Sequence, residues 1–242
     1  MYHGRRGLSP MLYNHNINAA AVHLIDILRT AGAANYLELG CWTGALGNYQ
    51  VDRYGAKWIG IEGSLEAINS GLHRFKVYNY DLNKGAEGIA PLIRECDTLV
   101  MVDVLEHLYE PLEFLKEAIG FMKKNATIIV VLPNIGCHQV VEKLLAGSFA
   151  YEDSGILDRT HRYFWTPNSF LKDCKELGLT PVHGPIFLRN GDGEDLLQRS
   201  NEMLGYTFMK GPCYEVSLKC SGAMLESLSS YGFAYALGMS DD

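Results

Sequence analysis

Five short apolar runs, separated by stretches with helical periodicity, constrain the fold of this chain more than any other feature. The runs occupy residues 36–39, 58–61, 75–80, 98–102 and 127–132. The clearest helix lies between the last two runs, where apolar side chains recur on one face of residues 111–122 behind an initial proline. Strands that alternate with helices predict an α/β fold, in which a mostly parallel, doubly wound sheet carries helices on both faces.

The pattern loosens in the second half of the chain. Residues 140–145 and 167–177 predict helices, and residues 149–166 between them predict a long loop. Long loops in compact domains are commonly functional, so a cap over a pocket is expected near residues 146–168. The segments expected to finish the sheet, with an antiparallel last strand, are residues 181–188 and 214–219.

The expected organisation is one sheet-containing core with a further segment at each end. Residues 1–33 are expected to form an arm and a first helix, residues 34–188 the core, and residues 189–242 an extension that completes the sheet or contacts another subunit. The stretch 227–239 is apolar but interrupted by glycine. Because an uncovered apolar tail would expose a patch, this stretch is expected either to pack on a second subunit of a homodimer or to cover the sheet edge.

Charge and cysteine spacing narrow the range of partners. The formal net charge of −7 argues against a nucleic-acid partner, because phosphate binding needs clustered lysine and arginine. The six cysteines form no C-x-x-C pair, so neither a zinc site nor a disulfide framework is predicted, and no other metal site is expected. The start of the chain lacks the apolar core of a signal peptide, and no apolar run approaches the length of a membrane span. A cytoplasmic location without a membrane partner is therefore expected.

The strongest local signal is the stretch Y-L-E-L-G-C-W-T-G-A-L-G at residues 36–47, where an apolar strand runs into a glycine-bearing turn before a helix. This is the place where an α/β sheet binds ligands. A dinucleotide fingerprint requires G-x-G-x-x-G, whereas here three residues separate Gly40 from Gly44. A phosphate-binding P-loop would need a lysine after the second glycine, and none follows. The spacing therefore argues against both NAD and nucleoside triphosphates.

The pattern E-x-G-x-x-x-G in this stretch resembles the first motif of class I S-adenosylmethionine-dependent methyltransferases, which have a Rossmann-like fold. The resemblance implies that Glu38 serves the ammonium group of the cofactor's methionine part. Glycines at 40 and 44, on either side of Cys41, would allow close approach of the backbone. The N-terminus of the helix that follows could receive the methionine carboxylate.

Acidic residues also end the next three predicted strands. Glu62 ends the second strand, where a carboxylate can accept hydrogen bonds from both ribose hydroxyls. The resemblance assigns Asp81 to the adenine amino group, with the backbone near Leu82 at the ring edge. Each acid alone would also suit a surface or capping position, whereas four in register indicate a site. The residues expected to hold S-adenosylmethionine are Glu38, Gly40, Cys41, Gly44, Glu62, Gly63, Asp81, Leu82, Asp103 and Val104.

Two further stretches resemble one branch of this enzyme class. They are D-V-L-E-H-L-Y-E-P at residues 103–111 and S-G-I-L-D-R-T-H-R-Y-F-W-T-P-N-S-F at residues 154–170. Both are similar to the ubiquinone-biosynthesis-like and methionine-biosynthesis-associated branch, and the resemblance covers residues 34–180. Two departures bear on the shape of the acceptor site: Tyr163 follows Arg162 where the family often has the reverse order, and Trp165 replaces a phenylalanine.

The same stretches supply the candidates for proton transfer and acceptor binding. His161 could act as general base, because an imidazole takes up a proton near neutral pH. His107 is the other candidate, since the resemblance places this histidine near the cofactor's sulfonium, although it could also only cap or pack. Asp158 and Arg162 could instead pair and lock the loop onto the sheet. The residues expected to contact the acceptor are Tyr13, Tyr109, Asp158, Arg162 and Tyr163.

These observations lead to one functional hypothesis and two alternatives. The hypothesis is transfer of a methyl group from S-adenosylmethionine to an oxygen or nitrogen of a small molecule, such as a sugar or glycan precursor or a specialised metabolite. One alternative is an NAD-dependent oxidoreductase. The other is a non-catalytic, cofactor-binding accessory protein of a biosynthetic partner enzyme, which the methionine-biosynthesis-associated branch suggests.

Overall fold

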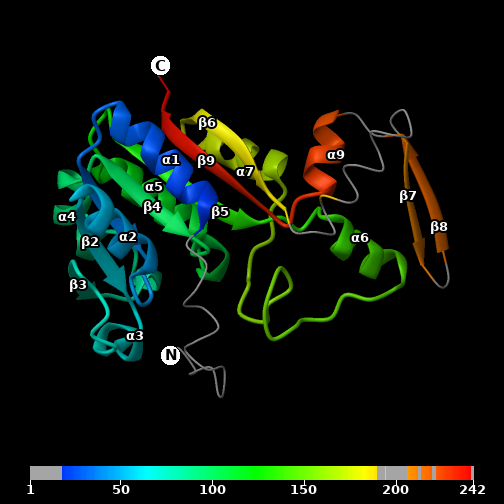
Figure 1. The fold of residues 1–242 in the computed structure, drawn as a ribbon, viewed down its shortest axis with the longest axis horizontal. Helices are drawn as coiled ribbons and strands as arrows, with labels where there is room; N and C mark the ends of the chain where they lie inside the picture. Colours follow the sequence, from blue (N-terminus) through cyan, green and yellow to red (C-terminus); the bar gives the residue numbers. More distant parts are fainter. Residues whose placement is uncertain (1–17, 190–193, 195–205, 212–213, 220–221, 241–242) are drawn as a thin grey trace.

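The computed structural model describes residues 18–189, 194, 206–211, 214–219 and 222–240. A seven-stranded sheet, in the order β3-β2-β1-β4-β5-β9-β6, forms the centre of the molecule (Figure 1). Its strands are β1 (Asn35–Leu39), β2 (Lys57–Glu62), β3 (Lys76–Asn79), β4 (Thr98–Val102), β5 (Thr127–Pro133), β6 (Leu179–Leu188) and β9 (Gly232–Met239). The first five strands pair in parallel, and β9 is antiparallel to both β5 and β6.

Helices cover both faces of the sheet, which confirms the doubly wound α/β prediction. The helices are α1 (Ala19–Thr30), α2 (Ala45–Tyr54), α3 (Leu65–Asn69), α4 (Ala90–Glu95), α5 (Pro111–Phe121), α6 (His138–Leu145), α7 (Pro167–Glu176) and α9 (Gly222–Leu228). One buried cluster packs α1 and α2 on the sheet, and a second packs α4, α5 and α7 on the opposite face. The strand order changes direction between β1 and β4, which makes their carboxyl ends the topological switch point.

Local sequence signals account for where several helices begin. Asn18 caps α1 by accepting a hydrogen bond from the backbone NH of Ala21 at 3.1 Å. Pro111 occupies the first turn of α5, where its missing NH costs no hydrogen bond. Thr166 and Ser169 form a reciprocal capping box at the start of α7. These helix starts follow from residues that the sequence already marks.

The C-terminal half of the sheet differs from the sequence-based expectation. Residues 181–188 lie within β6 as predicted, but residues 214–219 do not join the large sheet. They form β8 (Tyr214–Lys219), which pairs with β7 (Tyr206–Gly211) in a separate two-stranded sheet. The position in the large sheet is taken by β9, whose Phe233–Leu237 segment is buried. A strand with both faces covered needs a continuous apolar run, which that segment has and the alternating segment 214–219 lacks.

The apolar stretch 227–239 is therefore mostly an interior part of the fold. For this region the sequence left open completion of the sheet, contact with a second subunit or a cover over the sheet edge. In the structure β9 lies within the sheet, between β5 and β6, with neighbours on both sides. Asn134, which follows β5, holds the start of this stretch by two hydrogen bonds. Its Nδ2 donates to the carbonyl oxygens of Ser227 at 2.7 Å and Ser230 at 2.9 Å. Asn134 is fully buried.

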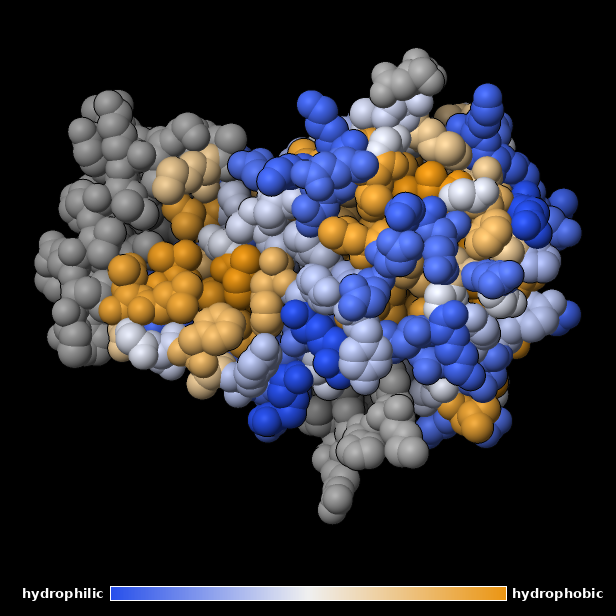
Figure 2. All heavy atoms as spheres, turned by 180° about the vertical axis from the view of Figure 1, so that it is seen from behind, coloured by the Kyte–Doolittle hydropathy of each residue, from blue (hydrophilic) through white to orange (hydrophobic). Residues whose placement is uncertain are grey.

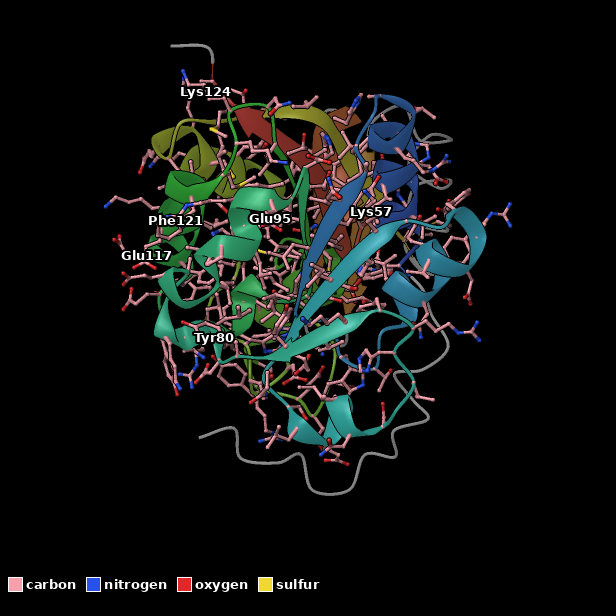
Figure 3. All side chains as sticks on the ribbon, turned by 90° about the vertical axis from the view of Figure 1, so that its left-hand side faces the viewer. Lys57, Tyr80, Glu95, Glu117, Phe121 and Lys124 are labelled. Carbon is pink, nitrogen blue, oxygen red and sulfur yellow. The ribbon has the colours of Figure 1, made fainter. Side chains whose placement is uncertain are left out.

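The parallel strands bring their carboxyl ends to one edge of the sheet. In Figure 3, Lys57 marks the start of β2 and Tyr80 lies just past the end of β3, so the strands run from the Lys57 end toward the Tyr80 end. On the neighbouring α5, Glu117 accepts a hydrogen bond from the backbone NH of Ala86 at 2.7 Å. This bond holds the segment after β3 against α5, on one side of the sheet edge where the parallel strands end.

The surface carries apolar side chains at the end of the molecule that bears α6 and α9 (Figure 2). Leu144, Leu145, Phe149 and Tyr151 are exposed there. Across the ranges that the structure describes, none of the helices combines the length and the apolar composition that a membrane crossing requires.

Candidate functional site

The turn after β1 sits at the switch point and is shaped by three left-handed residues. Gly40, Trp42 and Gly44 have φ angles of +68°, +47° and +83°. Gly44 is also the N-cap of α2, and as a glycine it offers no side chain to the NH groups of the first helical turn. Those NH groups and the positive end of the helix dipole suit an anionic group of a ligand. A Cβ atom on Gly40 would lie 2.7 Å from Cγ2 of Val104, so the turns after β1 and β4 pack directly on each other.

Glu38 lies beneath this turn and is almost completely buried, with 5% of its surface exposed. One of its carboxyl oxygens accepts a hydrogen bond from Nε1 of Trp58 at 2.8 Å. Burial raises the pKa of Glu38 to about 8, and the bond from Trp58 only partly offsets the lost hydration. A positively charged ligand group near Glu38 would favour the charged form and would be held by it.

Glu62, at the end of β2, holds the glycine turn in place. Its Oε2 accepts a hydrogen bond from the backbone NH of Trp42 at 2.8 Å, and its Oε1 accepts one from Ser64 at 2.7 Å. A carboxylate has about four lone pairs, so each oxygen keeps the capacity to accept one more hydrogen bond. These two acceptor positions fit two neighbouring ribose hydroxyls, which would donate to them. Gly63 follows, and a Cβ there would meet only ordinary contacts.

The residues that follow β3 and β4 complete this edge of the sheet. Asp81 caps the short 3₁₀ helix η2 (Leu82–Lys84) by accepting bonds from the backbone NH and the side-chain amide of Asn83 at 3.0 and 3.2 Å. Leu82 is buried and lines a groove beside the start of α5. Asp103 has a φ of +52°, and its backbone NH bonds the carbonyl of Val131 at 3.1 Å. At Asp103 the left-handed backbone turns the chain abruptly out of β4. Aspartate adopts this conformation more readily than bulky residues do.

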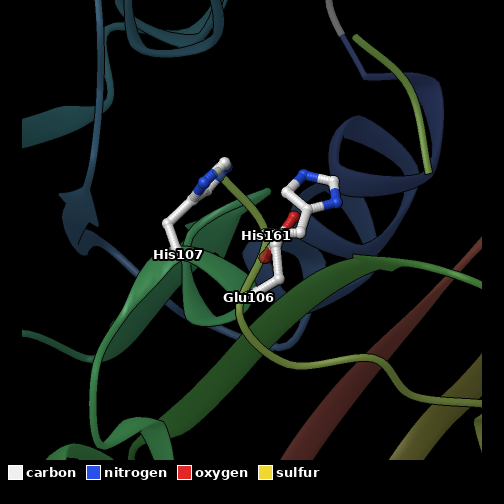
Figure 4. Close-up of side chains that lie close together, drawn as sticks. All are labelled: Glu106, His107 and His161. Carbon is white, nitrogen blue, oxygen red and sulfur yellow. The ribbon is translucent and has the colours of Figure 1, made fainter. Parts of the chain in front are cut away.

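A cluster of three ionisable side chains lies next to Asp103. Glu106 and His107 belong to η4 (Leu105–His107), and His161 comes from the loop 149–166. One possible ligand atom from each of the three lies within 4.8 Å of the others, and Figure 4 shows the side chains pointing toward one another. The two imidazole centroids are 4.8 Å apart. The loop is docked here by its backbone, because the carbonyl of Glu106 accepts a hydrogen bond from the NH of Arg162 at 2.7 Å.

Hydrogen bonds fix which nitrogen of each histidine carries the lone pair. Nδ1 of His161 lies 2.8 Å from the carbonyl oxygen of Ile156, which can only accept, so Nδ1 is the donor. The hydroxyl of Thr160 donates to Asp158 at 2.6 Å and therefore accepts from Nδ1 of His107 at 3.0 Å. In the neutral forms of both rings, Nε2 carries the lone pair.

Glu106 is the residue of this cluster that the sequence-based site list omits. It is fully buried, and neither carboxyl oxygen has a hydrogen-bond partner among the described residues. Burial raises its pKa well above the ordinary value, and the nearby charges of Asp103 and Asp158 raise it further. Buried carboxyl groups are almost always paired, so a buried carboxyl without a partner among the described residues is exceptional. The signal in the sequence was an acid between Leu105 and His107, four residues after the end of the buried strand β4.

The residues expected to contact an acceptor are distributed around the same cluster. The guanidinium of Arg162 lies over the ring of Tyr109 at 4.0 Å, and Tyr109 is exposed. The hydroxyl of Tyr163 donates to the carbonyl of Tyr109 at 3.2 Å, while Asp158 bonds the neighbouring Thr160. Tyr109, Arg162 and Tyr163 thus form a connected group beside η4. Tyr13 lies outside the described residues.

Comparisons with known proteins agree with this geometry. The sequence model of a family described as a methyltransferase domain matches residues 13–184. A SAM-dependent methyltransferase from Archaeoglobus fulgidus, 15% identical, superposes with a TM-score of 0.57 over 94% of this chain and 98% of that one. An S-adenosylmethionine-dependent methyltransferase from Clostridium acetobutylicum, 10% identical, gives 0.54 over 96% and 95%. At these identities the two structures establish a common fold. No curated protein sequence matches the chain.

Proposed function

Because this chain belongs to the methyltransferase-domain family and is an S-adenosylmethionine-dependent enzyme, we propose that it methylates an oxygen or nitrogen atom of a small molecule. A small acceptor is favoured over a nucleic acid by the net charge of −7. The observation that carries the proposal is the meeting of the glycine turn, the acidic strand ends and the histidine pair at one switch point.

The residues at this edge fit the cofactor part by part. The turn from Gly40 to Gly44 and the start of α2 would receive the methionine carboxylate, with Glu38 serving the ammonium group. Glu62 would accept the ribose hydroxyls with the lone pairs that Trp42 and Ser64 leave. The remaining contacts would come from Asp81 and Leu82 at the adenine and from Cys41, Gly63, Asp103 and Val104 around them. When bound, S-adenosylmethionine supplies a methyl group on a positively charged sulfur.

The histidine pair lies beside Asp103, on the side of the edge where the acceptor would approach. Methyl transfer depends mainly on positioning, because the nucleophile must approach in line at near-contact distance. A hydroxyl or amine must also lose its proton as the new bond forms. His161 or His107 would accept that proton on Nε2, while Nδ1 stays held by Ile156 or Thr160. Tyr109, Arg162 and Tyr163 would contact the acceptor from the loop side.

Calorimetric titration with S-adenosylmethionine, S-adenosylhomocysteine and NAD tests the proposal. The first two are expected to bind, and Glu62→Gln is expected to weaken them about 10- to 100-fold, because hydrogen bonds to a charged group are lost. Glu66→Gln, on the exposed side of α3, is the matched control and should bind normally. Binding of NAD without either methionine derivative would establish the oxidoreductase alternative. Cofactor binding without turnover on any acceptor would favour the accessory-protein alternative.

A further inference from the structure

Trp42, in the glycine turn after β1, adopts a backbone conformation that is unfavourable for residues other than glycine. Its φ angle of +47° lies in the left-handed region, although it carries a large side chain. Such a conformation is strained and persists only where the surrounding structure holds it. Strained residues of this kind cluster at ligand-binding sites. The contacts that hold Trp42 therefore bear on how the turn binds a ligand.

Hydrogen bonds restrain the peptide groups on both sides of the Trp42 Cα atom. The NH of Trp42 donates to Oε2 of Glu62 at 2.8 Å, which holds the peptide group before it. Nε2 of His73 lies 2.6 Å from the carbonyl oxygen of Trp42, and because a carbonyl oxygen only accepts, Nε2 is the donor. His73 therefore holds the peptide group that leads from Trp42 to Thr43 and on to Gly44.

The imidazole of His73 also packs against the N-cap of α2. A Cβ atom on Gly44 would lie 2.6 Å from Cδ2 of His73 and 3.2 Å from the ring of Phe75, so the two rings occupy the space that glycine leaves. The rings of His73 and Phe75 meet edge to face, with centroids 5.6 Å apart. The sequence does not single out His73, because it lies 31 residues after Trp42 and reaches the turn only in the folded chain.

Asn48, on α2, holds the segment that carries His73. Its Nδ2 donates to the carbonyl of Leu72 at 2.8 Å, and its Oδ1 accepts from the NH of Arg74 at 2.7 Å. The amide of Asn48 thus pairs with the residues immediately before and after His73. Arg74 also forms an ion pair with Asp52 at 2.8 Å, but both side chains are exposed, and such pairs contribute little. Asn48 therefore determines where the imidazole lies relative to the turn.

We propose that His73 is a positioning residue for the methionine part of S-adenosylmethionine, because it holds the turn from Trp42 to Gly44, and that Asn48 holds His73 in place. This inference rests on the proposed function, in which the turn and the start of α2 receive the methionine carboxylate. The NH groups there bind an anion only while the turn keeps its arrangement. Glu62 holds the preceding peptide group and would accept the ribose hydroxyls, so loss of the His73 bond should affect the methionine part more than the ribose.

Calorimetric titration with S-adenosylhomocysteine and with methylthioadenosine tests the proposal without turnover. The second ligand has the adenosine part and the sulfur but lacks the amino and carboxyl groups. His73→Met keeps the length of the side chain but loses the donor. We expect this variant to bind S-adenosylhomocysteine about 10-fold more weakly, since one hydrogen bond is lost, with methylthioadenosine binding little changed.

Two further variants show whether the donor itself is responsible. His73→Gln offers an NH donor at a similar reach and should recover most of the lost affinity for S-adenosylhomocysteine. His183→Met, on the exposed part of β6, is the matched control and should bind both ligands as the wild type does. A glutamine variant as impaired as the methionine variant would contradict the role of the His73 donor.

Asn48→Ala tests whether Asn48 acts through His73. In the wild-type background this substitution should weaken S-adenosylhomocysteine binding, because it releases the segment that carries the imidazole. In the His73→Met background it should cause little further loss, since the donor is already absent. The two effects should therefore be non-additive. Additive losses would contradict the placement of His73 by Asn48.

The outcomes separate this role from the proposed function. Circular dichroism and thermal unfolding would establish which variants are folded, and if His73→Met does not fold, Asn48→Ala carries the same comparison of the two ligands. Unchanged affinity for both ligands would overturn the proposal, even with a loss of stability. Equal weakening of both would also overturn it, since a general distortion affects the adenosine part as well. Failure of the wild type to bind S-adenosylhomocysteine would instead contradict the proposed function.

Discussion

The hydroxyl of Thr160 accepts a hydrogen bond from Nδ1 of His107 at 3.0 Å while donating its own proton to Asp158 at 2.6 Å. Thr160 therefore holds the imidazole of His107 by its Nδ1. Removing this hydrogen bond should therefore change which nitrogen of His107 carries the proton.

Thr160→Val should keep the size of the side chain but lose both hydrogen bonds. Without a fixed Nδ1 proton, His107 can populate the other tautomer, in which Nε2 carries the proton and cannot accept one. If His107 is the proton acceptor of the proposed function, we expect kcat to fall, by at most about 100-fold, with S-adenosylmethionine affinity retained. Thr160→Ser restores the hydroxyl and should recover most of the loss. A serine variant as impaired as the valine variant would show that Thr160 acts through packing.

The second prediction concerns the glycine turn. Gly40 has a φ of +68°, and an added Cβ would lie 2.7 Å from Val104. Gly71 has nearly the same φ, +67°, but open space around the same position. Gly71→Ala should therefore cost about 1 to 2 kcal/mol of unfolding free energy, from the left-handed backbone alone. Gly40→Ala should cost more and should also weaken cofactor binding, since the turn must shift.

Urea unfolding of the two alanine variants measures this difference, and a double mutant identifies its cause. If the clash with Val104 is responsible, Gly40→Ala combined with Val104→Ala should be less destabilised than the sum of the two single variants. Equal destabilisation of the Gly40 and Gly71 variants would mean that the contact with Val104 is unimportant.

The third prediction follows from the raised pKa of Glu38. The group ionises near pH 4.5 when unfolded but near pH 8 when folded, so between these values the folded state holds a proton that the unfolded state has released. The contribution of Glu38 to stability is therefore complete below pH 4.5 and is lost as the pH rises to about 8. The slope is at most about 1.4 kcal/mol per pH unit.

Urea unfolding of the wild type and Glu38→Gln across this range isolates the contribution, since other groups titrate equally in both. The stability of the wild type should fall relative to that of the variant as the pH rises. Glu66→Gln, exposed on α3, should follow the wild type. If the unfolding free energies of wild type and Glu38→Gln change in parallel with pH, the pKa of Glu38 is not raised in the folded state.

Much of the fold could be predicted from the sequence because its determinants are local. Alternating strands and helices, the capping residues of α1 and α7, and the glycine turn are each encoded within a few neighbouring positions. Glu62 and Asp103 were placed at strand ends for the same reason, and parallel pairing then brings those ends to one edge. Their contacts with a cofactor remain predictions.

The burial of Glu106 and the position of β9 could not be predicted, because both depend on contacts between segments that are far apart in the sequence. Glu106 is buried because the loop 149–166 folds back over η4, and no local pattern encodes that docking. The partners of β9 are equally non-local, because β5 lies about a hundred residues earlier in the chain. The alternation in residues 214–219 correctly predicted a strand, but alternation does not say with which strand it pairs.

The last prediction tests what holds β9 in the sheet. The side chain of Asn134 is buried between β5 and the turn before β9, where Nδ2 bonds the carbonyls of Ser227 and Ser230 and Oδ1 accepts from the NH of Gly136 at 3.0 Å. Asn134→Ala leaves these three backbone groups without their partner in a buried place. We expect a loss of about 2 to 4 kcal/mol in unfolding free energy, since each unsatisfied buried group costs roughly 1 kcal/mol or more. Asn134→Asp should be about as damaging, because a carboxylate accepts from Gly136 but cannot donate to the two carbonyls. Hydrogen exchange should show faster opening of the β9 amides in both variants, and unchanged protection there would mean that β9 is held by its strand pairing alone.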